Sequence, residues 1–179
     1  DWIQAHLQCT FLDKAMPIVT LFGDGGVFWI LVAVALLFFA KYRKTGFSMG
    51  MALILGLLVC NIFLKPQVAR IRPYNFQLQE YGREITLLVK GLNDYSFPSG
   101  HTIASFEACT VLMLHDKRLG IPATVLAILI AFSRLYLYVH YPTDVLVSVV
   151  LGILFGILGN LIVNAIYKKF VYKGKYIEE

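Results

Sequence analysis

The chain has 179 residues, of which 58% are hydrophobic, and its mean hydropathy is +0.69. An ordinary soluble protein does not have this composition, so the apolar runs are best explained as membrane spans within a single domain. The net charge of +5 comes from short basic clusters between the apolar runs, which suits membrane topology and anionic lipid, and no motif predicts a nucleic-acid partner.

The first 22 residues are predicted to form an amphipathic helix. Apolar residues follow helical spacing through residues 1–17, with Trp2 placed to lie at the membrane interface. A helix packed against other helices explains the same spacing. The run from Gly23 to Gly26, which contains Asp24, predicts a turn. No cleavable signal peptide is expected, because residues 1–20 lack a long apolar core.

The rest of the chain, residues 23–179, is predicted to be a transmembrane core. The predicted spans are residues 27–40, 47–64, 102–114, 121–139 and 144–167. Residues 65–98 form a long polar outer loop, and loops of this length are often functional. The fold class is therefore all-α: a polytopic bundle of five or six spans with an N-terminal amphipathic helix.

Basic residues predict the orientation of this bundle. Five spans place residues 41–44, 115–120 and the C-terminal tail on one side, and that tail includes Lys173 and Lys175. This side holds more lysine and arginine than the other once Lys65, Arg72 and Arg134 are set aside for chemistry. The positive-inside rule then places it in the cytoplasm. The protein is expected in the cell (cytoplasmic) membrane, with the outer loop facing outside.

Three stretches predicted to reach the outer surface carry the chemistry, and the first is residues 65–73, KPQVARIRP. Lys65 and Arg72 are seven residues apart, so they share a face if the segment is helical. Taken alone, these two cations are equally well explained as anchors to lipid headgroups.

The second stretch is Pro98-Ser99-Gly100-His101, directly before a predicted span. Backbone N–H groups at a helix N-terminus bind anions, and glycine allows close approach. Taken alone, a helix cap and turn with a hydrogen-bonded histidine explains the same residues.

The third stretch, residues 133–144, contains Arg134, His140 and Asp144 at a predicted membrane surface, where ionisable groups are costly. His140 and Asp144 are four apart, so they can face each other across one helical turn. A carboxylate bonded to one ring nitrogen makes the other nitrogen a better nucleophile. A helix-end salt bridge beside an interfacial histidine is the alternative.

Together the three stretches bring three cations, a hydroxyl, backbone donors and two histidines to one surface, with a single carboxylate. This surplus of donors suits a phosphate group. A metal site would need more carboxylates or thiolates, and Cys9, Cys60 and Cys109 are scattered, so neither a metal nor another cofactor is predicted.

These motifs resemble the signature of the type 2 phosphatidic acid phosphatase (PAP2) superfamily: K-x6-R-P, P-S-G-H and S-R-x5-H-x3-D. All three match without departure, and their order and the spans fit most of the chain. The resemblance implies a metal-independent lipid phosphatase of the membrane. The superfamily also includes soluble vanadium haloperoxidases, but the apolar runs argue against that branch.

The resemblance also implies roles for individual residues. His140 is the expected nucleophile, oriented by Asp144, and His101 protonates the leaving oxygen and later activates water. Arg70 is expected to touch only headgroups. The expected phosphate-binding set is Lys65, Arg72, Ser99, Gly100 and Arg134.

The expected substrate is an amphiphile whose tail stays in the bilayer. Undecaprenyl diphosphate is favoured, because its recycling needs an outward-facing phosphatase; phosphatidylglycerophosphate, phosphatidic acid and lipid A phosphate are alternatives. A lipid transporter and a structural membrane protein are competing classes. Glu107, inside a predicted span, falls on a different face from His101; it is expected either to pair with a neighbouring helix or to lie in a polar crevice below the site.

Overall fold

The computed structural model describes residues 2–172, and Lys173 and Lys175 of the predicted basic tail lie outside this range. The described chain is helical and contains no strand within that range. Its helices are α1 Trp2–Leu7, α2 Thr10–Leu21, the 3-10 turn η1 Asp24–Gly26, α3 Val27–Leu37, α4 Arg43–Gly56, the π-helix η2 Leu57–Leu64, α5 Lys65–Val68, α6 Pro73–Tyr81, α7 Gly100–His115, α8 Lys117–Tyr136, α9 Pro142–Ile166 and the π-helix η3 Tyr167–Tyr172.

Four largely helical stretches within the described residues are long and apolar enough to cross a membrane. They are Thr10–Leu37, Arg43–Tyr81, Lys117–Tyr136 and Pro142–Phe170. The α7 helix has 16 residues and is shorter than a typical span of about 20. The predicted all-α, polytopic architecture is confirmed, whereas the number of five or six spans stays a prediction.

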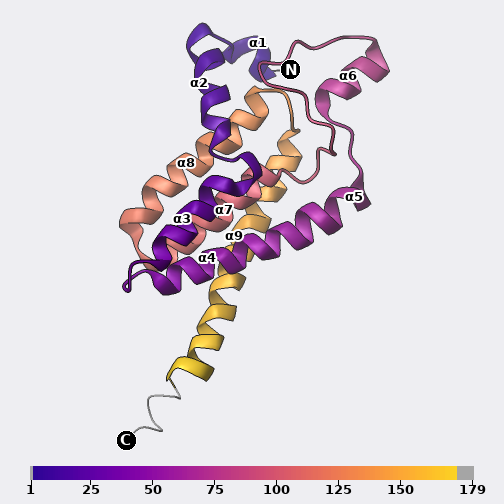
Figure 1. Ribbon diagram of the computed structural model, residues 1–179. Helices are drawn as coiled ribbons and strands as arrows, with labels where there is room; N and C mark the ends of the chain where they lie inside the picture. Colours follow the sequence, from indigo (N-terminus) through magenta and orange to yellow (C-terminus); the bar gives the residue numbers. More distant parts are fainter. Residues whose placement is uncertain (1, 173–179) are drawn as a thin grey trace, which may run out of the picture.

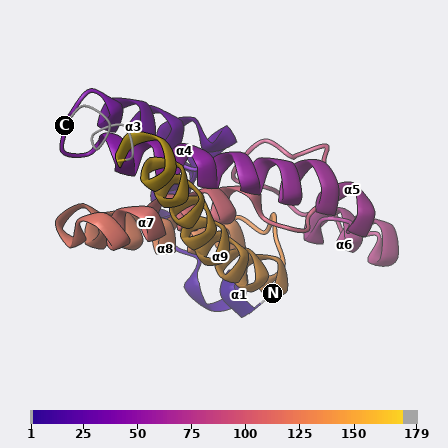
Figure 2. The same cartoon turned by 90° about the horizontal axis from the view of Figure 1, so that it is seen from below.

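Helix α7 is the centre of the bundle and packs against α4, α8 and α9 (Figures 1 and 2). Glycines on α9 allow its close approach to α7. A Cβ atom at Gly152 would lie 2.7 Å from Cβ of Phe106, and one at Gly156 would lie 2.7 Å from Cβ of Thr110. Small residues at a helix interface are a common solution in membranes, because lipid provides little hydrophobic force to drive helices together.

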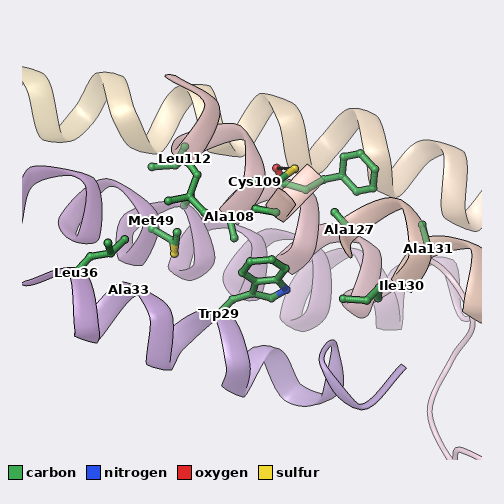
Figure 3. Packing of buried hydrophobic residues seen from close by; sticks show 14 of the residues in the cluster. Trp29, Ala33, Leu36, Met49, Ala108, Cys109, Leu112, Ala127, Ile130 and Ala131 are labelled. Carbon is green, nitrogen blue, oxygen red and sulfur yellow. Dashed lines mark hydrogen bonds between the residues drawn. The ribbon is translucent and has the colours of Figure 1, made fainter. Parts of the chain in front are cut away.

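The apolar core lies between α3, α4, α7 and α8 (Figure 3). Trp29, Met49 and Ile130 are almost completely buried there. The indole N–H of Trp29 donates a 3.0 Å hydrogen bond to Oγ of Ser105, which satisfies its polar atom inside the core. This packing fixes α3 against α7.

The N-terminal helices pack on the end of α8 nearest the outer loop (Figure 1). The side chain of Gln4 donates hydrogen bonds to the carbonyl oxygens of Leu135 and Tyr136, and Met16 is buried. These contacts favour a helix packed against other helices over one that only lies on the membrane, although Trp2 stays exposed.

Lys65 and Arg72 are expected to share a face only if residues 65–72 are helical, and these residues do not form one helix. Helix α5 ends at Val68, and Ala69 takes a left-handed conformation with φ of 47°. Arg72 is extended (φ −69°, ψ 151°), because the ring of the following Pro73 disfavours a helical residue before it. Pro73 instead begins α6 inside the region predicted as a loop, and Gly82 ends that helix in a left-handed cap.

Candidate active site

A cavity of about 620 Å³ lies where the three predicted stretches meet, between α3, η2, α7 and the outer loop. Six of the eight predicted site residues line it: Lys65, Arg72, Gly100, His101, Arg134 and His140. Ser99 and Asp144 lie behind its wall. The cavity therefore brings together residues from stretches that lie far apart in the sequence.

Arg72 is the link between the first and third stretches. Its side chain is buried, and Nη1 donates a 2.8 Å hydrogen bond to the carbonyl oxygen of Val139. The same Nη1 lies 3.3 Å from Nε2 of His140. Because a guanidinium can only donate, this contact identifies Nε2 as the unprotonated nitrogen and leaves the ring proton on Nδ1.

His140 is buried, and its charge state follows from its surroundings. Burial, together with the positive charges of Arg134 and Arg72, outweighs the nearby Asp144 and lowers the pKa of His140 from 6.5 to about 3. Its Nδ1 lies 3.5 Å from Oδ2 of Asp144, just beyond ordinary hydrogen-bond range. Neutral at pH 7, the imidazole can act as a nucleophile through the lone pair on Nε2.

Asp144 is held mainly by other groups. Its carboxylate accepts hydrogen bonds from the Ser96 hydroxyl, from the backbone N–H of Tyr141 at 2.9 Å and from Arg70 at 2.6 Å. The Arg70 guanidinium also lies 3.8 Å from the ring centre of Tyr141. The expectation that Arg70 touches only headgroups is therefore wrong: it binds the Asp144 carboxylate, which lies next to His140.

An unpredicted carboxylate lies between two of the predicted phosphate-binding cations. Asp94, in the outer loop, accepts a 2.5 Å hydrogen bond from Nζ of Lys65 and another of 2.5 Å from Nη2 of Arg72. Its partial burial raises the pKa of Asp94, but the hydrogen bonds from these two cations outweigh that effect and hold it at about 2. Asp94 is therefore charged at neutral pH and neutralises part of the cation surplus.

Arg134 and Ser99 differ in how they meet the cavity. Arg134 lines it and donates a 2.5 Å hydrogen bond from Nη1 to Oγ1 of Thr20, while its buried Nε has no partner among residues 2–172. Ser99 is fully buried, and its hydroxyl accepts a bond from Thr102. Gly100, the first residue of α7, lines the cavity and can present its backbone N–H there.

His101 also has a carboxylate partner that the sequence did not reveal. Its Nε2 lies 2.6 Å from Oδ1 of Asp24, in the turn before α3. A carboxylate only accepts, so Nε2 carries a proton and donates it. Each histidine of the site thus has its own aspartate nearby: Asp24 for His101 and Asp144 for His140.

Glu107 lines the same cavity, farther along α7. Gly100, Ile103, Ala104 and Glu107 follow helical spacing on one side of that helix. Glu107 is 1% exposed, and its Oε1 has no hydrogen-bond partner among the described residues. Of the two expectations for Glu107, the polar crevice below the site describes the structure better, and the cavity places it on a shared wall with His101.

Comparison with known proteins gives a consistent result. Residues 41–168 match the PAP2 superfamily. An undecaprenyl-diphosphatase of Sulfolobus acidocaldarius is 34% identical over 146 residues, which cover 81% of this chain and 68% of that protein.

Two solved structures have the same fold. The crystal structure of Aquifex aeolicus LpxE superposes with a TM-score of 0.74 at 28% identity and covers 88% of this chain and 90% of its own. A transmembrane PAP2-type phosphatidylglycerolphosphate phosphatase from Bacillus subtilis gives a TM-score of 0.67 at 26% identity, with 91% of this chain and 80% of its own covered.

Proposed function

The chain belongs to the PAP2 superfamily and is a membrane lipid phosphatase, and we propose that it hydrolyses its substrate through a phosphohistidine formed on His140. The observation that carries this proposal is the position of His140: Nε2 is unprotonated, lies 3.3 Å from Arg72 and faces a cavity shared with Lys65 and Arg134.

In the first step, Nε2 of His140 attacks the phosphorus atom. The bond from phosphorus to the leaving oxygen breaks, and that oxygen keeps the electron pair and takes a proton from His101. Arg72, Lys65 and Arg134 neutralise charge that builds on the phosphoryl oxygens, assisted by the backbone N–H of Gly100 and, if its hydroxyl turns toward the cavity, by Ser99. Asp144 stabilises the positive charge that the phosphorylated ring acquires.

In the second step, water replaces the histidine. His101, now neutral, removes a proton from a water molecule whose oxygen attacks phosphorus. The P–N bond breaks, its electron pair returns to Nε2, and inorganic phosphate leaves. No step requires a metal ion, because arginine and lysine supply the positive charge.

The surroundings of the cavity support an amphiphilic substrate. An apolar groove of about 410 Å³ lies between α3 and α4 and shares Ile30, Leu53 and Leu57 with the cavity. A lipid chain in this groove would leave its phosphate among the cations and its apolar length against apolar side chains. The groove continues along α4 as far as Gly46, about 16 Å of helix from Leu57 at 1.5 Å per residue.

Undecaprenyl diphosphate is the substrate we propose first. The similarity to an undecaprenyl-diphosphatase and the apolar groove support it. Phosphatidylglycerophosphate, phosphatidic acid and lipid A phosphate are alternatives that the same mechanism would hydrolyse. We also propose that the site faces the extracytoplasmic side, because Lys41, Arg43 and Arg118 lie at or next to the first turns of α4 and α8, at the ends of these helices opposite the site.

A phosphate-release assay on detergent-solubilised protein tests this function. The panel comprises undecaprenyl diphosphate, phosphatidylglycerophosphate, phosphatidic acid and lipid A, each with wild-type protein and the His140→Ala variant. We expect release from at least one lipid, insensitivity to chelator and loss of turnover in the variant. Chelator-sensitive release would contradict the metal-free mechanism, and release by His140→Ala would contradict the nucleophile.

A further inference from the structure

The N-terminal segment, residues 2–26, lies outside the region that matches the PAP2 superfamily and yet contacts two residues of the site. The first contact is between Thr20, near the end of α2, and Arg134. Both side chains are buried, at 3% and 2% exposure, and Nη1 of Arg134 donates a 2.5 Å hydrogen bond to Oγ1 of Thr20. The Thr20 hydroxyl thus fixes one arm of a guanidinium that also lines the cavity.

The second contact depends on the turn between α2 and α3. Gly25 and Gly26 have positive φ angles of 57° and 68°, a conformation that other residues rarely adopt. At Gly23, a Cβ atom would lie 2.7 Å from Cδ2 of His101, so only glycine leaves room for the ring. The turn therefore places the Asp24 carboxylate 2.6 Å from Nε2 of His101.

We propose that Asp24 and Thr20 are positioning residues that complete the site: Asp24 holds His101 as the general acid, and Thr20 orients Arg134 toward the phosphoryl group. This inference rests on the proposed function. Burial and the positive charge of Arg134 outweigh Asp24 and lower the pKa of His101 to about 4, so the ring is neutral at pH 7 before a phosphate group binds. The Asp24 carboxylate fixes a proton on Nε2, and the negative charge of the bound phosphate favours a second proton on Nδ1, which the ring gives to the leaving oxygen. In the second step the same carboxylate holds the ring while Nδ1 takes a proton from water.

Contacts away from the cavity hold the segment in place and supply a matched control. The hydroxyl of Tyr136 donates a 2.6 Å hydrogen bond to Oδ1 of Asp13 and accepts one from the backbone N–H of Cys9. Asp13 thus anchors the same segment to α8 without lining the cavity. Replacement of Asp13 shows how much activity is lost when the N-terminal segment is held less firmly against α8. Replacement of Asp24 shows in addition the effect of removing the carboxylate at His101.

The test for Asp24 compares leaving groups. Loss of a general acid slows release of an alkoxide, as from phosphatidic acid, far more than release of p-nitrophenolate, which needs no proton. For Asp24→Asn we expect kcat/KM, which reports the first step alone, to be about 100-fold lower on phosphatidic acid and less than threefold lower on p-nitrophenyl phosphate. Asp24→Glu should recover part of the loss, and Asp13→Asn should slow both substrates by the same small factor.

The test for Thr20 measures binding and needs no turnover. Titration calorimetry with inorganic phosphate should give a Kd about tenfold higher for Thr20→Val than for wild type, and close to wild type for Thr20→Ser, which keeps the hydroxyl. Equal binding by Thr20→Val and wild type would overturn the role of Thr20.

Failure of this inference and failure of the proposed function are distinguishable. If Asp24→Asn loses the same fraction of its activity on both substrates, Asp24 is a merely structural residue. A melting temperature of Asp24→Asn lowered as far as that of Asp13→Asn would support the same conclusion. Full activity of Asp24→Asn would also overturn its role. If wild-type protein releases phosphate from no lipid and not from p-nitrophenyl phosphate, the proposed function itself is wrong and the role of Asp24 is overturned with it.

Discussion

The Asp94 carboxylate lies 2.5 Å from Nη2 of Arg72, in a position where a phosphoryl oxygen could also bind that guanidinium. Its other oxygen lies 2.5 Å from Nζ of Lys65. A loop carboxylate thus bridges two cations of the cavity, and a bound phosphate must either share them with Asp94 or displace it.

The first prediction concerns this competition. Asp94→Asn removes one negative charge next to the two cations, so inorganic phosphate should bind about three- to tenfold more tightly, as measured by titration calorimetry. Since the pKa of Asp94 is about 2, this carboxylate stays charged above about pH 4, and the variant should bind phosphate more tightly than wild type throughout that range. Weaker phosphate binding by the variant would show instead that Asp94 positions the cations for substrate.

The second prediction concerns stability and pH. The pKa of His140 is lowered to about 3, so below pH 6.5 the unfolded chain takes up a proton at His140 that the folded protein does not. Stability should therefore fall as the pH is lowered from 6.5 toward 3, by about 1.4 kcal/mol for each pH unit inside this window. The melting temperature should fall more between pH 7.5 and pH 5 for the wild-type protein than for His140→Asn. An equal drop in both proteins would mean that His140 is protonated in the fold.

The third prediction concerns the close approach of α4 and α7. A Cβ atom at Gly56 would lie 2.0 Å from Oε1 of Glu107, at the flexible end of a side chain that lines the cavity, so Gly56→Ala should displace this carboxyl group and destabilise the protein by about 1 kcal/mol. Glu107→Ala in the same chain should relieve most of this loss, a coupling that a double-mutant cycle of thermal stability measures. Additive effects would contradict the contact. Glu107→Gln, which keeps the shape, tests whether the carboxyl group itself contributes to turnover.

The fourth prediction concerns the groove between α3 and α4. A Cβ atom at Gly50 would meet no atom within 4 Å, so Gly50→Leu fits the fold and fills the groove. We expect kcat/KM to fall about tenfold for a long-chain prenyl diphosphate and to stay unchanged for p-nitrophenyl phosphate. The control is Val150→Leu, on the exposed side of α9. Unchanged activity of Gly50→Leu on the prenyl substrate would place the lipid chain elsewhere.

The sequence was sufficient to predict residues that line one cavity, because each motif is local; their roles in the chemistry stay a prediction. Pro98 to His101 precedes a helix, and His140 lies just before another, so hydropathy alone places both at the ends of apolar helices. The cavity brings six predicted residues together, although the backbone between Lys65 and Arg72 leaves the helix after Val68. The signal was present in Pro73, which forces the preceding residue out of the helix.

The contacts that refine the site could not be predicted, because they join loops far apart in the chain. Asp24 and His101 are 77 residues apart, and Asp94 and Lys65 are 29 apart. No periodicity links a turn or an irregular loop to a distant helix end. Arg70 is similar: it lies two residues from Arg72, yet it binds Asp144, 74 residues away, whereas Arg72 binds Asp94 in the outer loop.

The most direct test of the account is to find the phosphoryl group on the protein. Wild-type protein is mixed with lipid substrate, quenched within milliseconds in alkali, where phosphohistidine survives, and digested for mass spectrometry. The account predicts one phosphoryl group on His140 of the wild-type protein and none on His140→Ala. With p-nitrophenyl phosphate as substrate, His101→Ala should hold more of this phosphoryl group than wild type, because that variant slows the attack by water. A phosphoryl group on any other residue, or full turnover by His140→Ala, would contradict it.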